Sequence, residues 1–179
     1  MQQVMEEATL GGGCFWCLEA VFGKLRGVEL CENGYSGGAD PKPTYEKVCS
    51  GRSGHVEVVR LRFDPATISF DTLLDVFFTI HDPTTLNRQG HDVGTQYRSG
   101  IYFTTPEQAA EARALIDELT QAGAYPRPIV TEVLPLANYH PAEGYHQDFF
   151  ARNPGQGYCL AVAAPKVAKF RQTWARLAR

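Results

Sequence analysis

A cysteine that follows three glycines is the first group in this chain that could do chemistry. Glycines at 11–13 precede Cys14, and two bulky aromatic residues, Phe15 and Trp16, come directly after it. The apolar residues that follow recur at helical spacing, so a helix is expected to begin at or beside Cys14. The free amides and the dipole of a helix start favour negative charge, and the thiolate is the reactive form of cysteine. The stretch therefore indicates a nucleophile beside an aromatic pocket.

The other cysteines raise the question of a dithiol or a metal site. Cys17 forms a Cys-x-x-Cys pattern with Cys14, which can indicate a redox-active pair. Zinc would require two more ligands at paired spacing, but Cys31 and Cys49 stand alone and no histidine pair flanks them, so no metal site is expected. Cys159 follows a glycine-rich stretch that is expected to be flexible enough to approach another cysteine. The cysteines alone do not decide which of them acts with Cys14.

A glutamate on a predicted strand is the candidate proton donor. Residues 55–63 alternate as a strand, and the face that carries Glu57 is more apolar than the face that carries Arg60 and Arg62. Glu57 is therefore expected to point toward the core, away from both arginines. Burial disfavours the charged form of a carboxyl group, so Glu57 would stay protonated near neutral pH and could act as a general acid.

A long polar stretch, residues 81–98, joins a predicted helix to a predicted strand and is expected to lack regular structure. Connections of this length in a compact domain are commonly functional. Taken alone, Asp92 is best explained as a turn residue between two glycines, and Tyr45 and Tyr97 as amphipathic surface residues. His146, further along the chain, is expected to hydrogen-bond locally.

These residues must be positioned by alternating strands and helices. The apolar patterns predict strands at 7–10, 28–32, 55–63, 101–103 and 129–134, with a glycine-rich turn at 33–38. They predict helices that begin near residue 14 and at 69, 105, 142 and 165, the third of them opened by a capping box from Thr105 to Gln108 and closed by Gly123. No repeat or linker interrupts this order. The chain is therefore expected to be one α+β domain, residues 1–179, a two-layer sandwich with helices packed on a mixed sheet.

The composition narrows the classes of partner. The formal net charge is −3 and no basic stripe is present, which argues against a nucleic-acid or anionic-membrane partner. No run approaches the roughly 20 apolar residues that span a bilayer, and the acidic N-terminus lacks the apolar stretch of a signal peptide. Five cysteines, an odd number, fit a reduced compartment. The chain is therefore expected to be cytoplasmic, and any disulfide in it to be catalytic.

Several longer motifs resemble those of the peptide methionine sulfoxide reductase A family. They follow one another through almost the whole chain: GGCFW (12–16), GYSGG (34–38), PTY (43–45), CSG (49–51), GHVE (54–57), HDPTT (81–85), DVGTQYRS (92–99), YHQD (145–148) and NPGQGYC (153–159). Two residues depart from the usual pattern. Val56 replaces the more common alanine, which should alter packing more than chemistry, and Cys17 is found in only part of the family.

The resemblance implies a fold and an activity. The fold would be the ferredoxin-like plait of the family, and the activity the reduction of the S epimer of methionine sulfoxide, free or in proteins, to methionine. The resemblance implies Cys14 as the nucleophile, which becomes a sulfenic acid. It implies Glu57 as the acid, and Tyr45 and Tyr97 as hydroxyl donors to the sulfoxide oxygen.

The resemblance also implies a substrate pocket and partners. Phe15 and Trp16 would enclose the methyl group of the substrate, and Asp92 would organise the polar side of the site. Cys159, in a glycine-rich segment at about 153–163, holds the position of the resolving cysteine, whose disulfide with the nucleophile an external dithiol, thioredoxin, would reduce. Neither a metal nor an organic cofactor would be needed, and the chain is expected to be a monomer.

Three other functions compete with this interpretation. A general disulfide oxidoreductase would use Cys14 and Cys17, but it leaves Glu57 and the two tyrosines without a role. A non-catalytic module would bind methionine-rich or oxidised segments through the aromatic pocket, and a scaffold would hold a metal on its cysteines. The sequence also leaves open whether Cys17 or Cys159 resolves first, which oxidised proteins are preferred and which reductant acts.

Overall fold

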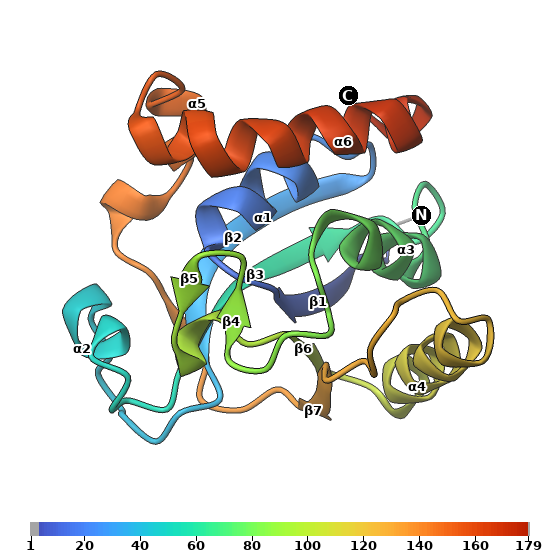
Figure 1. Cartoon of the computed structure of the whole chain (residues 1–179), viewed down its shortest axis with the longest axis horizontal. Coiled ribbons are helices and arrows are strands. Elements are labelled where there is room, and N and C mark those ends of the chain that lie inside the picture. Colours follow the sequence, from blue (N-terminus) through green and yellow to red (C-terminus); the bar gives the residue numbers. More distant parts are fainter. Residues whose placement is uncertain (1–3, 179) are drawn as a thin grey trace.

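The computed structural model describes residues 4–178, and in that part six strands form one sheet. They are β1 (Glu6–Gly11), β2 (Val28–Ser36), β3 (Val56–Phe63), β6 (Gly100–Phe103), β7 (Glu132–Pro135) and β8 (His140–Pro141). Their order across the sheet is β7-β6-β1-β3-β2-β8, and only β6 and β7 run parallel (Figure 1). The mixed sheet expected from the sequence is confirmed.

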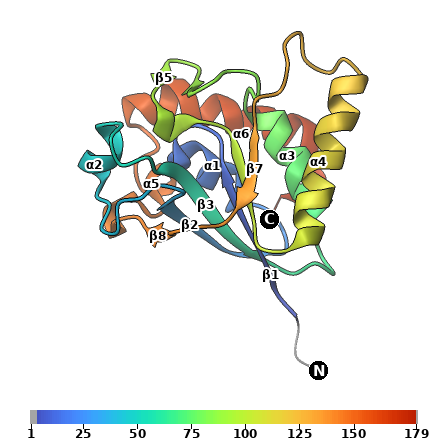
Figure 2. The ribbon, with the colours of Figure 1, turned by 90° about the horizontal axis from the view of Figure 1, so that it is seen from below.

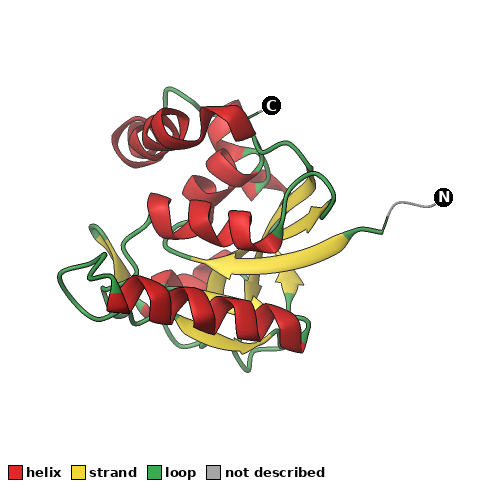
Figure 3. Cartoon of the chain, turned by 90° about the vertical axis from the view of Figure 1, so that its right-hand side faces the viewer, coloured by secondary structure: helices red, strands yellow, loops and turns green. Residues whose placement is uncertain are grey.

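The described residues also contain six α-helices. They are α1 (Phe15–Phe22), α2 (Tyr45–Cys49), α3 (Phe70–Ile80), α4 (Pro106–Gln121), α5 (Phe149–Arg152) and α6 (Ala164–Trp174). Seen from below, the sheet lies in front of α1, α3 and α6, so these three helices are on one side of it (Figure 2). α6 packs against α1 and α3 on the side away from the strands (Figure 3).

Four strands and two helices make the ferredoxin-like plait. The chain order β1-α1-β2-β3-α3-β6 places β6, β1, β3 and β2 side by side, each antiparallel to its neighbour. The main core fills the space between this sheet and the helices, with large side chains that include Leu10, Phe22, Leu61 and Phe77. The predicted α+β architecture, a mixed sheet with helices packed on it, is therefore confirmed.

Two segments that were predicted to be irregular are partly strands. β2 continues to Ser36, through Gly34 in the stretch expected to form a turn, because it pairs with β3 on one side and with β8 on the other. The stretch 81–98 contains a hairpin, β4 (Arg88–Gln89) and β5 (Asp92–Val93), and a 3-10 turn at Thr95–Tyr97. The prediction that this stretch lacks regular structure is therefore wrong.

The helix expected at 142–152 is divided into two pieces. A 3-10 turn at Gly144–His146 is followed by Asp148 in the left-handed conformation (φ 55°) and then by α5. β7 starts at Glu132, three residues later than predicted, and α2 was not predicted at all. No helix within residues 4–178 is long and apolar enough to cross a membrane.

Candidate active site

The turn between β1 and α1 places Cys14 directly before the helix, with an extended backbone (φ −62°, ψ 130°). Glycine is required in this turn. Gly13 has φ +97°, and a Cβ atom there would come within 2.7 Å of the Gln89 side chain. A Cβ atom on Gly12 would meet the His81 ring at 3.1 Å. The glycines thus allow the hairpin and the end of α3 to close tightly around the candidate nucleophile.

Cys14 and Cys17 form a buried thiol pair in the first turn of α1, where 8% of Cys14 and none of Cys17 is exposed. Burial raises the pKa of Cys14 well above its usual value, and the neighbouring Cys17 and Glu57 raise it further. A hydrogen bond from Cys14 lowers the pKa of Cys17 to about 7 despite burial, and the charge of Lys166 contributes. The two thiols therefore titrate as a hydrogen-bonded pair, and within it burial works against the thiolate that the helix start was predicted to favour at Cys14.

Glu57 lies on β3 and is held against the start of α1. Its Oε1 accepts a hydrogen bond of 3.1 Å from the backbone N–H of Phe15, and its buried Oε2 has no hydrogen-bond partner among the described residues. Burial raises the pKa of Glu57 to about 8 against the effect of the Phe15 bond, and the charges of Asp92 and Cys17 add to the rise. The carboxyl group is therefore protonated at neutral pH, as predicted.

The arginines of β3 are turned away from Glu57, as the alternation of the strand predicted. Arg60 pairs with Glu7 (3.1 Å) and with Glu32 (3.5 Å) on the neighbouring strands. Arg62 is exposed. Neither cation therefore stabilises a charged Glu57, and burial decides the protonation state of its carboxyl group.

Aromatic rings surround Trp16, which is half-buried. Its indole N–H donates a hydrogen bond of 3.1 Å to Nδ1 of His146, and its ring stacks on Phe149 with the centroids 3.8 Å apart. The ring of Tyr158 stands edge-on at 5.8 Å. Phe15 is fully buried and packs against the His146 ring at 5.1 Å. The structure thus brings the two predicted pocket residues together, with Phe15 beneath the surface and Trp16 partly exposed.

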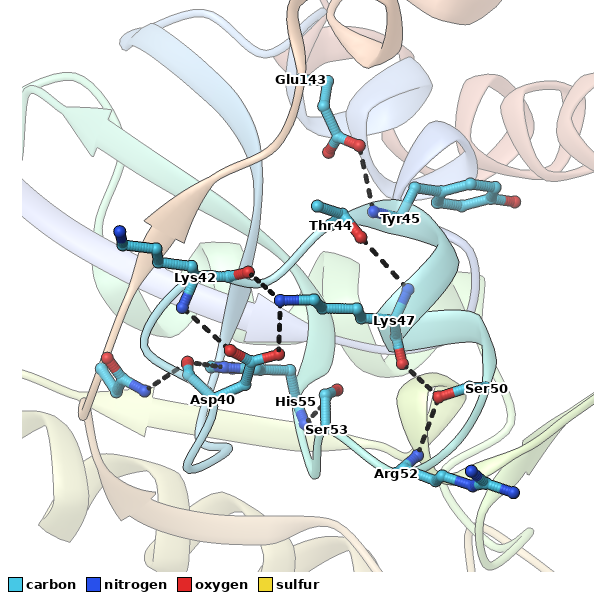
Figure 4. A network of polar contacts seen from close by, with 11 residues as sticks. Asp40, Lys42, Thr44, Tyr45, Lys47, Ser50, Arg52, Ser53, His55 and Glu143 are labelled. Atoms are coloured by element: carbon cyan, nitrogen blue, oxygen red, sulfur yellow. Dashed lines mark hydrogen bonds and ion pairs between the residues drawn. The ribbon is translucent and has the colours of Figure 1, made fainter.

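The short helix α2 brings Tyr45 to the site. Thr44 caps this helix by accepting a hydrogen bond of 3.3 Å from the N–H of Lys47, and the N–H of Tyr45 donates to Oε2 of Glu143 at 3.0 Å (Figure 4). The ring of Tyr45 lies 6.4 Å from that of Trp16. Burial raises the pKa of Tyr45, so its hydroxyl keeps its proton and can donate it in a hydrogen bond.

Tyr97 closes the 3-10 turn that follows the hairpin. Burial raises its pKa, and a negative charge on Glu57 would raise it further, as it would for Tyr45. Both tyrosines are therefore near the acid, although the sequence separates them from it by 12 and 40 positions. The structure brings the three predicted oxygen-binding side chains into one site.

Asp92 is bound to the C-terminal part of the chain. Its Oδ2 accepts a hydrogen bond of 2.6 Å from the hydroxyl of Tyr158, which also lies 3.6 Å from Sγ of Cys17. Asp92 therefore does more than shape a turn, because it links the hairpin to the thiol pair. Tyr158 belongs to the motif at 153–159, but its contact with the thiols was not predicted.

Cys159 lies in a single π-turn, Cys159–Ala163, that continues without a break into α6. It is fully buried, and its N–H donates to Oε1 of Gln156 at 3.0 Å. Burial raises the pKa of its thiol, and the charge of Cys17 raises it further. None of the five cysteines, all of which are among the described residues, forms a disulfide. The segment expected to be flexible is thus partly helical, and it places Cys159 near Cys17.

Three residues beside the site were missed or misread in the sequence. Glu143 holds Tyr45, and the buried Glu19 accepts a hydrogen bond from Asn33 on β2. His146 was expected to bond locally but binds Trp16, 130 positions away. The only signal for His146 was its place in a motif. Within residues 4–178, no group of three or more potential ligand side chains is arranged to hold a metal ion.

Comparison with known proteins relates this site to a family. A family model described as peptide methionine sulfoxide reductase matches residues 6–178. The peptide methionine sulfoxide reductase MsrA of Chromobacterium violaceum is 54% identical over 173 residues, which cover 97% of this chain and 98% of that protein. The MsrA of Polynucleobacter asymbioticus is 54% identical over 167 residues, with 93% and 88% covered.

Solved structures agree with these relatives. The reduced form of Mxr1 from Saccharomyces cerevisiae matches with a TM-score of 0.79 and 33% identity, covering 87% of this chain and 89% of that one. Methionine sulfoxide reductase A of Corynebacterium diphtheriae matches with a TM-score of 0.78 and 38% identity, covering 89% and 80%. The chain therefore belongs to the peptide methionine sulfoxide reductase family and is an MsrA enzyme that reduces methionine sulfoxide.

Proposed function

We propose that this reductase acts on the S epimer of methionine sulfoxide, free or within oxidised proteins, and thereby repairs them. The observation that carries the proposal is the buried carboxyl group of Glu57, whose Oε2 has no partner in the described part of the chain and whose Oε1 is bound to Phe15. The oxygen of a sulfoxide is a poor leaving group until it is protonated. A protonated carboxyl group beside a thiol supplies that proton.

In the proposed reaction, Cys14 attacks the sulfoxide sulfur while its own thiol proton passes to Cys17. Glu57 protonates the sulfoxide oxygen, and Tyr45 and Tyr97 donate hydrogen bonds to it. A bond forms between Sγ of Cys14 and the substrate sulfur. The protonated oxygen then transfers from the substrate sulfur to Sγ of Cys14 as this sulfur–sulfur bond breaks, so that methionine leaves and Cys14 is left as a sulfenic acid. The hydrogen bond between the two thiols supports this route, because the proton is already shared between them.

We assign substrate binding to the aromatic and polar sides of the site. Trp16, with Phe15 beneath it, would contact the methyl group of the substrate. Asp92 would organise the polar side together with Tyr158, whose hydroxyl it binds. The partial exposure of Trp16 among four aromatic rings supports the assignment.

Cys159 would then attack the sulfenic acid on Cys14, which gives a disulfide and releases water. An external dithiol, thioredoxin, would reduce that disulfide by exchange. A relative supports this partner, since Mxr1 from Saccharomyces cerevisiae has been solved in complex with Trx2. Cys17 is a second candidate for the resolving step, because it is hydrogen-bonded to Cys14 and lies near Cys159.

We also propose that the enzyme acts as a monomer, as one catalytic domain, in the cytoplasm. One main core joins all the large helices to the sheet, which supports a single domain. The odd number of cysteines supports a reduced compartment.

A single-turnover experiment tests the thiol assignments. Pre-reduced Cys14→Ser should release no methionine from the S sulfoxide. Cys159→Ser should release about one equivalent per enzyme, since one sulfenic acid forms, and should then stall with thioredoxin. Cys31→Ser is the matched control and should behave like wild type. Normal turnover by Cys14→Ser would contradict the assigned nucleophile.

The same samples decide between the two resolving cysteines. After one turnover without reductant, peptide mapping should find Cys14 joined to Cys159. A disulfide between Cys14 and Cys17, together with normal steady-state turnover by Cys159→Ser, would assign the resolving step to Cys17 instead.

A further inference from the structure

His146 contacts both aromatic side chains that are proposed to face the substrate. Its Nδ1 accepts the hydrogen bond of 3.1 Å from the Trp16 indole, and its ring lies 5.6 Å from that of Trp16 and 4.5 Å from that of Tyr45. The side chain is fully buried. His146 therefore lies between α1, which carries Trp16, and α2, which carries Tyr45.

The hydrogen bond fixes the protonation state of this histidine. Because Nδ1 accepts from the indole, the proton of the neutral ring is on Nε2, which is buried and has no partner within the described residues. Burial lowers the pKa of His146, although Glu143 and Glu46 oppose the shift. A neutral ring with a free Nδ1 lone pair is the form that can hold Trp16.

Glu143, three residues earlier, makes the corresponding contacts with Tyr45. Its Oε2 accepts from the backbone N–H of Tyr45 at 3.0 Å, the contact drawn in Figure 4, and its Oε1 accepts from the Tyr35 hydroxyl at 2.8 Å. Tyr35 is on β2 and fully buried. Glu143 thus ties the first residue of a five-residue helix to the sheet.

The backbone of this segment is itself anchored to the core. The carbonyl of His146 accepts a hydrogen bond of 2.8 Å from Nδ2 of Asn33 on β2, and the same Asn33 amide donates to Glu19 on α1 at 3.0 Å. The segment that carries Glu143 and His146 is therefore fixed to both the sheet and α1. Because it is fixed, it can hold Trp16 and Tyr45, which are hydrogen-bonded to it, in constant positions.

We propose that His146 and Glu143 are positioning residues that set the separation between Trp16 and Tyr45. They do so without touching the substrate. This inference rests on the proposed function, in which Trp16 meets the methyl group and Tyr45 the oxygen of the same sulfoxide. α1 and α2 are separate elements, and although the rings of Trp16 and Tyr45 lie 6.4 Å apart, the shared segment is what binds both residues through hydrogen bonds.

Substitution of His146 tests whether this residue positions Trp16. The variants are made in a Trp174→Phe background, which leaves Trp16 as the only tryptophan. With dithiothreitol as reductant and free methionine S-sulfoxide as substrate, His146→Leu should raise KM about tenfold, the equivalent of one lost hydrogen bond, with a smaller change in kcat. It should also shift Trp16 fluorescence. His146→Asn keeps an acceptor near the Nδ1 position and should restore both readouts. His91→Leu, at an exposed position, is the control.

Wild-type KM and wild-type fluorescence in His146→Leu would overturn the positioning role. Trp16→Phe, assayed in parallel, separates this failure from failure of the proposed function. If Trp16→Phe leaves KM unchanged, Trp16 does not bind the substrate, and the fluorescence alone still decides whether His146 holds it. Urea midpoints of all variants identify any that are merely unfolded.

A double-mutant cycle tests whether Glu143 positions Tyr45. Glu143→Gln can keep the bond from Tyr35 but loses a carboxylate acceptor for the Tyr45 N–H, so kcat should fall several-fold. The same change in a Tyr45→Phe background should have no further effect on kcat, since the tyrosine hydroxyl that it positions is gone. Independent, multiplicative effects of the two substitutions would contradict the proposal.

Discussion

The protonation states of two neighbouring groups decide what this site can do. Glu57 keeps its proton because it is buried, and its Oε1 is bound to the N–H of Phe15, the residue directly after Cys14. Cys14 shares a proton with Cys17. The start of α1 therefore holds both the proton donor and the nucleophile. Any shift of that turn would move Glu57 and Cys14 together.

The pH dependence of the chemical step should follow Glu57. An acid with a pKa of about 8 is protonated below that value, so the single-turnover rate of the wild type should fall as the pH rises through about 8. Glu57→Gln cannot donate a proton, and its rate should be lower by roughly 100- to 10,000-fold and should lack this limb. KM should change little, because a proton donor acts mainly in the transition state. A Glu57→Gln rate close to that of wild type would remove Glu57 from the role of acid.

Part of this site was predictable from residue types alone. The alternation of β3 correctly directed Glu57 to the core, because a strand's faces follow from parity. The titration of the Cys14–Cys17 pair was not, because it depends on the hydrogen bond between the two thiols, on their burial, and on Lys166 and Tyr158, which lie more than 140 positions further along the chain. A local rule about helix starts cannot include burial or such distant neighbours.

At the scale of elements, the segment after β8 is held to α1 by a buried carboxylate. The Oε1 of Glu19 accepts from Asn33 at 3.0 Å, and its Oε2 accepts from the N–H of Asp148 at 3.0 Å. Only 6% of Glu19 is exposed, and burial raises its pKa. The carboxylate thus joins a helix, a strand and the chain that leads to α5.

Glu19→Ala should loosen this junction. The buried Asn33 amide would lose one of its acceptors, at a cost of about 1–3 kcal/mol in the free energy of unfolding, and the N–H of Asp148, an exposed residue, would lose its acceptor at a smaller cost. Urea denaturation should show the loss, and hydrogen exchange at the Asp148 amide should become faster. Glu29→Ala, on the exposed side of β2, should change stability by less than about 0.5 kcal/mol. Equal stability of the two variants would show that the junction does not depend on Glu19.

Helices and strands were predicted correctly where neighbouring residues in the sequence determine them, and wrongly where distant residues do. The capping residue of α4 was identified, since Thr105 accepts from the N–H of Gln108 at 3.2 Å. The second half of β2 was mistaken for a turn because Gly34 within it, and the two glycines directly after it, suggest one. Gly34 is instead required by close packing, since a Cβ atom there would lie 2.5 Å from the Tyr139 ring. Tyr139 is 105 positions away, so no local pattern could reveal it.

At the scale of the whole molecule, the protonated acid has a cost in stability. The pKa of Glu57 rises from an ordinary value near 4.5 to about 8 on folding. Between these values the folded chain holds a proton that the unfolded chain has released. Stability from this group is therefore present below about pH 4.5 and is lost as the pH rises toward 8.

The same Glu57→Gln variant should show this cost. Its free energy of unfolding should exceed that of the wild type by an amount that grows with pH between about 5 and 8. The upper limit of the slope is about 1.4 kcal/mol per pH unit. Urea unfolding of both proteins at several pH values measures the difference. A constant difference across this range would mean that Glu57 ionises normally in the folded state.

The fold class was predictable at this scale, while the closure of the site was not. The order of strands and helices indicated helices packed on a mixed sheet, and the sheet confirms it. The chain after β8 then returns over α1, where Phe149 stacks on Trp16 and Tyr158 reaches Asp92. These contacts join residues far apart in sequence, and only the three-dimensional arrangement shows them.

The first turn of α1 also has a handedness. A sulfoxide sulfur is pyramidal and carries three different groups besides its lone pair. In the proposed reaction, three consecutive residues act on the three sides of this sulfur. Cys14 attacks the sulfur itself, and Trp16 contacts the methyl group. The N–H of Phe15 holds Glu57, the acid that protonates the oxygen. A mirror-image sulfoxide would place its oxygen against the indole and its methyl group against the carboxyl. The chirality of one helical turn would thus select one configuration at sulfur, and a reductase for the other would need these two positions exchanged.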